Sequence, residues 1–419
     1  DPGITRFEIF DRPEDFGIRT VGVPQLGAVG VCFGPTITAI GPYFASHNFY
    51  MVAWHELAHV YAITISKGRV PRWFTEGLSE WEASVADPSW TRRSTALLKE
   101  ARAHGRLRKL SELELAFLRA GSSAMMEVAY MTAAYAMRYI GETYGRAKII
   151  AILEGYGEGK ATPELFQKHL GKSLEQVEKE FDLWFHAELD RSISGWSPSA
   201  GRGETDGLNL RFADAIEQAA AGDFTEASRS LQALIEDGGD GFETRMTLAR
   251  VLMKGPGRAN ATVHLQKAAA FNLESPEPHS LLAKLAREAK DPKEELKQLN
   301  RVLDLDAVNF ESTRDLMAVA MATGDKASLA RSARRCRAIA PLHPVCLAVT
   351  AYEIKDKKRA QKLLDDAAAA MTKIGLDAPA TAVMALTAKK LGQSGRATEW
   401  AKAARAGEGL SPAVAEKLP

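Results

Sequence analysis

Cysteine is scarce in this sequence, and long hydrophobic runs and an excess of charge of either sign are missing. The 419 residues include three cysteines, too few for a disulfide framework or a zinc-binding cluster. No run approaches the roughly 18 apolar residues that a membrane-spanning helix needs. Lysine and arginine number 54 against 53 aspartates and glutamates, which gives no electrostatic attraction to nucleic acid or an acidic membrane surface. We therefore predict no nucleic-acid partner and no membrane span in this chain.

The few cysteines also say little about the cellular compartment. Cys336 and Cys346 can pair across neighbouring helices, although two buried thiols are the expected state.

The chain begins at Asp1 and not at methionine, which indicates a processed form or an excised segment. An extracytoplasmic location in a bacterium, periplasmic or secreted, is the leading expectation. The length predicts two or three domains.

The strongest chemical signal is an HExxH motif, HELAH at residues 55–59, among apolar residues at helical spacing. Two histidines four apart on a helix point the same way, so their ring nitrogens can converge on one ion. Neutral imidazole suits zinc, and a catalytic zinc site takes three protein ligands and keeps one position open for water. We therefore predict a Zn²⁺ site that includes His55 and His59.

The third ligand is expected from a second helix, which opens within WFTEGLSE at residues 73–80. Glu76 is the leading candidate, and Gly68 and Pro71 mark the chain reversal between the two helices. Glu80 lies one turn after Glu76 and is expected to accept the N–H of a ligating histidine. An HExxH match also arises by chance on ordinary buried or surface helices. The apolar helix and the downstream glutamate favour the zinc interpretation.

HELAH followed by WFTEGLSE resembles the gluzincin metallopeptidases, the group that contains thermolysin and the zinc aminopeptidases, and most closely their bacterial peptidase MA-like branch. The resemblance covers residues 4–190. It implies an α+β zincin-like catalytic domain, a small sheet plus helices, in residues 1–190. It also implies that His55, His59 and Glu76 bind the zinc ion. In the same way, Glu56 would be the general base that activates water, and Glu80 matches an acidic position behind the ligands.

Residues 1–48 contain three short runs, at 4–10, 29–33 and 36–40, that predict a small sheet ahead of the zinc helices at 49–86. The resemblance implies that the edge strand of this sheet binds substrate backbone. Related aminopeptidases carry a GAMEN sequence here, whose glutamate holds the free amine of the substrate. The nearest match, GAVGV, has Gly30 in place of that glutamate. This departure favours an endopeptidase.

Residues 87–190 are predicted to form the helical part of the same domain. Tyr130 lies in a strongly helical stretch, and the resemblance implies that its hydroxyl stabilises the tetrahedral oxyanion. A core tyrosine is the alternative interpretation, and Tyr135 is the second choice for the catalytic role. His47 and His104 are further polar candidates near the site, although isolated histidines are more often ordinary surface or core residues.

A basic stretch runs from Arg92 to Lys109. A solvated helix face is the favoured interpretation, and contact with an acidic substrate is the alternative.

The last half of the chain has a different character. Residues 191–207 are rich in serine, glycine and proline and predict a linker or an ordered loop. Residues 208–419 contain Ala/Leu-rich helices with a period of 34, which resembles a tetratricopeptide array of five or six helix pairs. Such an all-α solenoid offers a concave surface to a peptide or protein partner. One repeat position, for example, holds Ala227, Ala261, Glu295 and Leu329.

The predicted function is zinc-dependent hydrolysis of a peptide or protein substrate, with Glu56 moving the proton from water to the leaving amine. An alternative is a latent metallopeptidase-like scaffold whose main role is protein binding through the repeats. A third possibility is attack of the activated water on another acyl bond.

Overall fold

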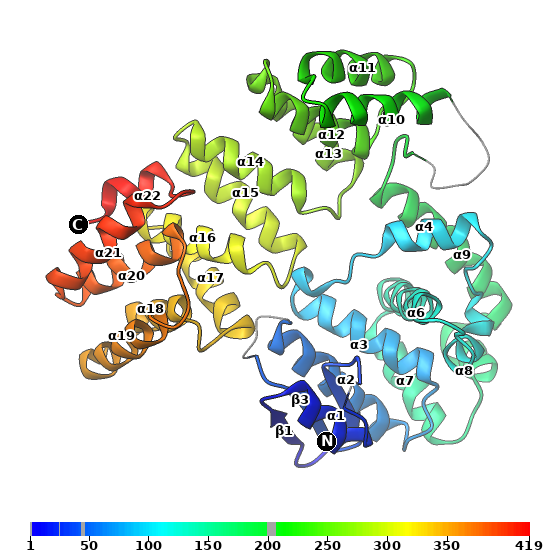
Figure 1. The fold of residues 1–419 in the computed structure, drawn as a ribbon. Helices are drawn as coiled ribbons and strands as arrows, with labels where there is room; N and C mark the ends of the chain where they lie inside the picture. The colour runs from blue at the N-terminus through cyan, green and yellow to red at the C-terminus, as the bar shows by residue number, and fades with distance from the viewer. Residues whose placement is uncertain (1, 25, 43–46, 199–206) are drawn as a thin grey trace. The chain divides into compact units, whose positions relative to one another are not determined.

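The computed structural model describes residues 2–24, 26–42, 47–198 and 207–419 (Figure 1). The chain forms two compact units. The first comprises residues 1–191 and 338–340, and the second comprises residues 192–337 and 341–419. Among the described helices, none combines the length and the apolar character that crossing a membrane requires.

A small mixed sheet lies at the start of the first unit, formed by β1 (Arg6–Phe10), β2 (Gly30–Phe33) and β3 (Thr36–Ile40) in the order β1-β3-β2. β1 runs parallel to β3, and β2 runs antiparallel to it. A tight turn joins β2 to β3, and Gly34 in this turn has a φ of 59°, which favours glycine. β2 is therefore one edge of the sheet.

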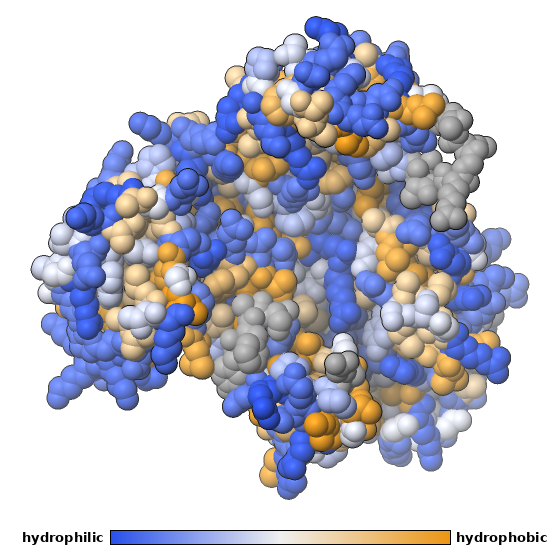
Figure 2. Space-filling model, viewed as in Figure 1, coloured by the Kyte–Doolittle hydropathy of each residue, from blue (hydrophilic) through white to orange (hydrophobic). Residues whose placement is uncertain are grey.

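The three predicted runs all contain a strand. The side chains of β1 are mostly exposed, with Phe7 at 41% and Ile9 at 49%. Exposed apolar side chains gather over this part of the chain (Figure 2). Helix α1 (Pro13–Val21) follows β1 and was not predicted. Its proline in the first turn and Gly22 just past its end are the local signals for it.

Two consecutive helices, α2 (Phe49–Ile65) and α3 (Arg72–Ala86), pack against each other behind the sheet. The side chain of Asn48 caps α2 by accepting the backbone N–H groups of Tyr50 and Met51. Gly68 has a φ of 75° in the reversal between the helices. These local devices account for the helix–turn–helix arrangement that the sequence predicts.

α3 also packs closely on the long helix α6 (Ser123–Tyr144). A Cβ atom added at Gly77 would lie 2.3 Å from the carbonyl oxygen of Ala133, so only glycine permits this approach. The remaining helices of the first unit surround the same core. They are α4 (Thr95–Ala103), α5 (Leu113–Leu118), α7 (Arg146–Gly157), α8 (Thr162–Leu170) and α9 (Leu174–Ser192), with short 3₁₀ turns at Pro88–Trp90 and Leu110–Glu112.

The second unit is an array of helices. Consecutive helices pack as pairs in α10–α11, α12–α13, α14–α15, α18–α19 and α20–α21. Their bounds are α10 (Gly207–Ala220), α11 (Phe224–Glu236), α12 (Phe242–Lys254), α13 (Ala261–Phe271), α14 (Glu277–Glu288), α15 (Pro292–Leu305), α16 (Phe310–Thr323), α17 (Lys326–Ile339), α18 (Pro344–Glu353), α19 (Lys357–Met371), α20 (Ala378–Lys390), α21 (Ser394–Ala406) and α22 (Pro412–Lys417). The predicted helical-repeat solenoid is therefore confirmed.

The period of 34 residues is explained by the side chains that recur as buried in each repeat. The positions four residues after those that define the period are buried in all four repeats, at Leu231, Leu265, Leu299 and Ala333. Each repeat presents the same apolar stripe to its neighbour, because no single helix pair can bury its own apolar face.

Cys336 and Cys346 form a disulfide, with their Cα atoms 5.5 Å apart. The expectation of two buried thiols is therefore wrong. The two residues lie on successive helices of the array, α17 and α18, and sequence spacing alone does not fix the distance between positions on two helices.

Only part of the predicted linker at residues 191–207 lies within the described residues, because 199–206 are outside them. The described part is an ordered segment. Ile193 pairs with Asn272 and Gly195 pairs with Gly241 through isolated β-bridges within the second unit.

Candidate metal centre

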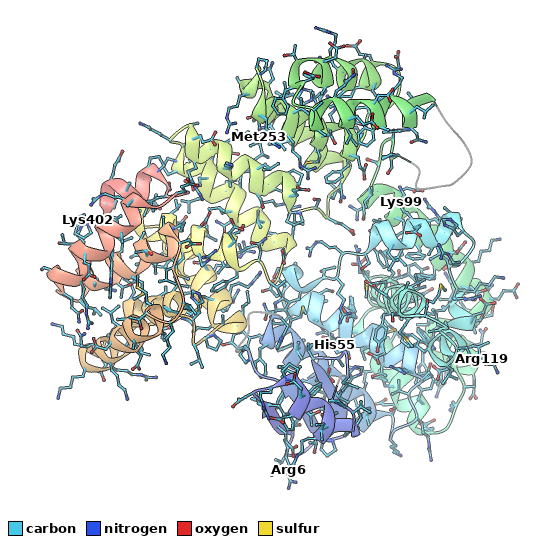
Figure 3. The ribbon with its side chains drawn as sticks, viewed as in Figure 1. Arg6, His55, Lys99, Arg119, Met253 and Lys402 are labelled. Atoms are coloured by element: carbon cyan, nitrogen blue, oxygen red, sulfur yellow. A yellow bond between two sulfur atoms is a disulfide. The ribbon has the colours of Figure 1, made fainter. Side chains whose placement is uncertain are left out.

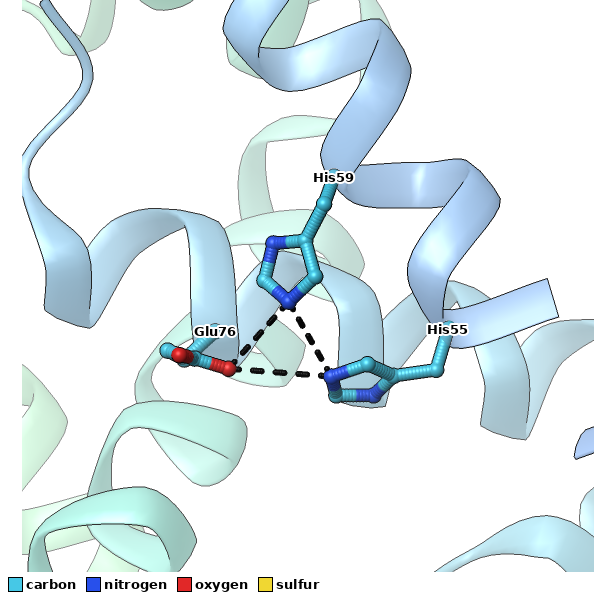
Figure 4. A group of neighbouring side chains, drawn as sticks. All are labelled: His55, His59 and Glu76. Atoms are coloured by element: carbon cyan, nitrogen blue, oxygen red, sulfur yellow. Dashed lines mark hydrogen bonds and ion pairs between the residues drawn. The ribbon is translucent and has the colours of Figure 1, made fainter. Parts of the chain in front are cut away.

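Three side chains of the first unit converge on one point between α2 and α3 (Figure 4). The Nε2 atoms of His55 and His59 lie 3.1 Å apart. A carboxylate oxygen of Glu76, Oε2, lies 3.2 Å from Nε2 of His59 and 3.6 Å from Nε2 of His55. The histidines come from successive turns of α2, and Glu76 comes from the second turn of α3. All three residues predicted as ligands are therefore in one place, and their role as ligands remains a prediction.

The donor atoms and their spacing fit a zinc ion. Zinc–nitrogen and zinc–oxygen distances near 2.1 Å in a tetrahedral site place neighbouring donor atoms about 3.4 Å apart. The three separations observed here bracket that value. Two imidazoles and one carboxylate form the ligand set of a catalytic zinc site, which leaves a fourth position open.

Two further residues orient the histidines. Nδ1 of His59 lies 2.8 Å from the hydroxyl oxygen of buried Thr75. Nδ1 of His55 lies 3.3 Å from Oε1 of Glu80, an ion-pair contact without hydrogen-bond geometry. A proton on each Nδ1 leaves the lone pair of each Nε2 directed at the shared point. Glu80 was expected in this position. Thr75 was missed, because no sequence pattern marks a threonine that reaches across to another helix.

The charges of the cluster are strongly coupled. Burial alone would lower the pKa of His55, but contacts with Glu76 and Glu80 outweigh it and raise this pKa to about 10. Burial would raise the pKa of Glu76, yet its contacts with both histidines hold that pKa well below its usual range. In the absence of a metal, a proton on His55 therefore provides positive charge at the point where the donor atoms meet.

Glu56 lies next to this point on α2 and is largely buried. Burial raises the pKa of Glu56, and the neighbouring histidines oppose the shift. Its side chain packs against β2, where a Cβ atom added at Gly30 would lie 2.8 Å from Oε1 of Glu56. A buried carboxylate with a raised pKa is suited to accept and return a proton near neutral pH.

Tyr130 reaches the same cluster from α6. Its hydroxyl donates to Oε1 of Glu76 at 3.0 Å and accepts from Nη2 of Arg72 at 3.2 Å. Burial and the charge of Glu76 raise the pKa of this phenol, and Arg72 opposes the shift. In this arrangement the hydroxyl orients Glu76 through the oxygen that points away from the histidines. The predicted oxyanion role would require the hydroxyl to turn toward substrate.

A cavity of about 670 Å³ opens onto these residues. The β2 edge lines it through Gly30, Val31 and Cys32, together with Glu56, the three candidate ligands, Glu80 and Tyr130. Figure 3 places His55 between the helices of the first unit, apart from the labelled Lys99 and Arg119. An extended chain beside β2 would pass the donor atoms.

Several other candidates do not line this cavity. The hydroxyl of Tyr135 lies 3.1 Å from that of Thr95, His47 contacts the carbonyl oxygen of Ile40, and His104 contacts that of Glu100. Tyr135, His47 and His104 are therefore not brought to the site.

The basic stretch divides in two. Lys99 and Arg102 pair with Asp190 on α9, and their side chains are only 30% and 28% exposed. Arg92 instead contacts Oε1 of Glu80 at 3.0 Å and lines the cavity. Arg72, four residues before Glu76, also lines it. The i, i+4 spacing of Arg72 and Glu76 was a signal available in the sequence.

Comparison with known proteins gives little. No protein-family model and no curated protein sequence matches the chain. Among solved structures, the chain is similar to the crystal structure of the yeast Tom70, with 10% sequence identity and a TM-score of 0.25 over 85% of this chain and 84% of that chain. Tom70 is an all-helical repeat protein of the tetratricopeptide type. A similarity this low carries no argument about function.

The assignment of residues 4–190 to the gluzincin metallopeptidases is wrong. The solved structure found, Tom70, is a helical-repeat protein, and the chain is 71% helical with a sheet of three strands among its described residues. The same finding overturns the zincin-like catalytic domain that was expected with that assignment. The assignment was based on HELAH and WFTEGLSE, and local helix spacing of this kind does not determine the surrounding fold. The side-chain arrangement at the site is a separate observation.

Proposed function

We propose that the first unit is a zinc-dependent hydrolase that cleaves peptide bonds. The observation that carries this proposal is the convergence of His55 Nε2, His59 Nε2 and Glu76 Oε2 within 3.6 Å of one another. These three residues would hold the ion, which when bound supplies a Lewis acid and lowers the pKa of water. An ion that is needed only for stability would have no use for a buried carboxylate beside it.

The residues of the chain supply the remaining chemistry. Glu56 takes a proton from water and delivers it to the leaving amine, and its raised pKa suits both steps. Among the described residues β2 is an edge strand, and such an edge can bind an extended peptide through its backbone groups. This edge favours a peptide substrate over other acyl compounds. Gly30 has no side chain that could hold the free amine of a substrate, which favours an endopeptidase.

The test compares the wild-type chain with Glu56→Gln and His55→Ala for bound zinc and for cleavage of a quenched peptide library. We expect Glu56→Gln to retain stoichiometric zinc and to lose at least about 1,000-fold in kcat. His55→Ala should lose both zinc and cleavage. The matched control is Glu82→Gln on α3, where Glu82 pairs with Arg146. Equal cleavage by wild type and Glu56→Gln would overturn the proposal.

A second candidate function is protein binding by the helical-repeat unit. None of the comparisons supports peptidase activity, and a stacked array of helix pairs is the architecture of protein-binding scaffolds. Zinc binding without cleavage of any peptide would favour this candidate. A partner bound equally by wild type and Glu56→Gln, and lost on substitutions in the repeats, would identify a scaffold. A substrate would instead accumulate on Glu56→Gln.

The disulfide of the second unit supports an extracytoplasmic location, because such bonds persist in oxidising compartments.

A further inference from the structure

Two arginines line the cavity that holds the three donor atoms of the first unit. Arg72 is the first residue of α3, and Arg92 follows the 3₁₀ turn Pro88–Trp90. Both line the cavity, and each side chain is 50% exposed. A ligand in the cavity would therefore meet two guanidinium groups beside the metal position.

Each guanidinium is anchored but retains donors. Arg72 contacts Glu76 through Nε at 3.4 Å, donates to Tyr130 through Nη2, and lies 5.5 Å from the centroid of the Phe117 ring. Arg92 contacts Glu80 through Nε at 3.0 Å. A guanidinium carries five N–H donors in a planar fork. The contacts therefore leave the outer N–H groups of both side chains available at fixed positions.

The charge of the cavity depends on the metal. Three carboxylates, Glu56, Glu76 and Glu80, line it together with the two arginines. With a divalent cation at the donor atoms, these carboxylates, the two arginines and the cation carry a net positive charge. The nearby basic residues of α4 do not add to this field directly, because Lys99 and Arg102 are paired with Asp190.

We propose that Arg72 and Arg92 bind a carboxylate of the substrate, so that the site selects peptides with a carboxylate near the scissile bond. This inference rests on the proposed function and specifies its substrate class. Arginine is suited to the role because its paired N–H groups match the two oxygens of a carboxylate. The carboxylate belongs either to an aspartate or glutamate beside the scissile bond or to the C-terminus of the substrate.

The experiment measures peptide binding to the full, zinc-loaded Glu56→Gln chain, which does not turn substrate over. Four labelled peptides are compared by fluorescence anisotropy, with Glu or Gln in the same position and with a free or amidated C-terminus. We expect the best carboxylate-bearing peptide to bind at least about 10-fold more tightly than its neutral counterpart. A Glu-over-Gln difference identifies a side chain, and an acid-over-amide difference identifies the C-terminus.

Arg92→Gln is the main variant, because Arg72 also contacts a candidate ligand. We expect Arg92→Gln to keep stoichiometric zinc and to lose most of the preference for the carboxylate, while Arg92→Lys restores part of it. Arg93→Gln is the matched control, because Arg93 donates to the carbonyl oxygens of Thr91 and Pro88 and does not line the cavity. Raising the salt concentration should also reduce the preference.

Equal binding of all four peptides would overturn the inference, and so would an undiminished preference in Arg92→Gln. Failure of the proposed function has a different signature, namely no bound zinc or no peptide cleaved by the wild-type chain. A wild-type enzyme that cleaves neutral and acidic peptides at equal rates would retain the proposed function and refute this inference alone.

Discussion

Each unit buries a cluster of charged side chains, and the two clusters differ in how the buried charges are compensated. In the second unit, Arg287 lies between Glu295 and Asp315, with its Nε 2.7 Å from an oxygen of Glu295. The hydroxyl of Ser411 donates to the other oxygen of Glu295 at 2.7 Å. Arg287 is 15% exposed and Glu295 is 1% exposed. Arg287 thus pairs with both carboxylates, and Ser411 of the same unit binds the remaining oxygen of Glu295.

In the first unit, Glu56, Glu76 and Glu80 are buried around two histidines, and the nearest guanidinium groups are half exposed at the rim. Buried carboxylates are costly unless an opposite charge compensates them. The difference between the clusters is informative. A cluster that only holds a fold together pairs its charges internally, whereas this one points its donor atoms at a common position, where a proton on His55 provides the positive charge in the absence of a metal.

The largest expected effect concerns that position. Replacing His59 with alanine removes one of three donor atoms and should reduce zinc affinity on the order of 1,000-fold or more, because two protein ligands seldom hold zinc. Isothermal titration with Zn²⁺, under competition from a chelator, measures the change. His104→Ala is the control, since His104 is exposed and contacts only its own helix. An unchanged zinc affinity in His59→Ala would show that the donor atoms of the first unit are not directed at a metal ion.

The second prediction tests the cluster of Arg287, Glu295 and Asp315 in the second unit. Arg287→Ala leaves Glu295 and Asp315 buried without their cation, although burial already raises the pKa of Asp315. Breaking a buried ion pair on one side costs about 3–5 kcal/mol, and urea denaturation of the full chain measures the loss of unfolding free energy. Zinc affinity should not change.

Arg258→Ala is the control for this substitution. Arg258 pairs with Glu288 at the surface, with both side chains more than 40% exposed, and such pairs contribute about 1 kcal/mol or less. If both variants are destabilised equally, the buried network of Arg287 contributes no more than a surface pair.

The sequence predicts those features that depend on local periodicity. The i, i+4 spacing of the histidines, the turn at Gly68 and the period of 34 residues each determine which side chains share a face, and the structure places them accordingly. Features set by tertiary packing were not predictable. The path that brings Arg92 into the cavity, the contact of Thr75 with His59 and the disulfide all join separate elements. The family assignment failed for a related reason, because two helical motifs contain no information about the sheet and helices around them.

A smaller effect is expected one contact away from the donor atoms. Glu80→Gln keeps the shape of the side chain but removes the charge that faces Nδ1 of His55. Loss of such a partner typically costs about 10- to 100-fold in metal affinity. The same zinc titration measures it, with Glu82→Gln on the same helix as the control. An effect as large as that of His59→Ala would mean that Glu80 binds the ion directly.

The last and most gradual effect is the pH dependence. In the metal-free protein the pKa of His55 is raised to about 10, above the ordinary value of 6.5. The charged histidine therefore stabilises the metal-free fold fully below about pH 6.5, and this stabilisation is lost as the pH rises through about 10. Zinc needs the neutral imidazole, so its affinity should change in the opposite direction and rise by up to about tenfold per pH unit over the same range.

Urea denaturation of the metal-free chain between pH 6.5 and 10, paired with zinc titrations at each pH, distinguishes these trends. In His55→Ala the decline in metal-free stability over this range should disappear. A metal-free protein equally stable at both ends of the range would show that His55 is neutral without zinc. The buried carboxylates would then lack the positive charge that the proton provides, and the contrast with the Arg287 cluster would be greater still, because only a bound cation could balance them.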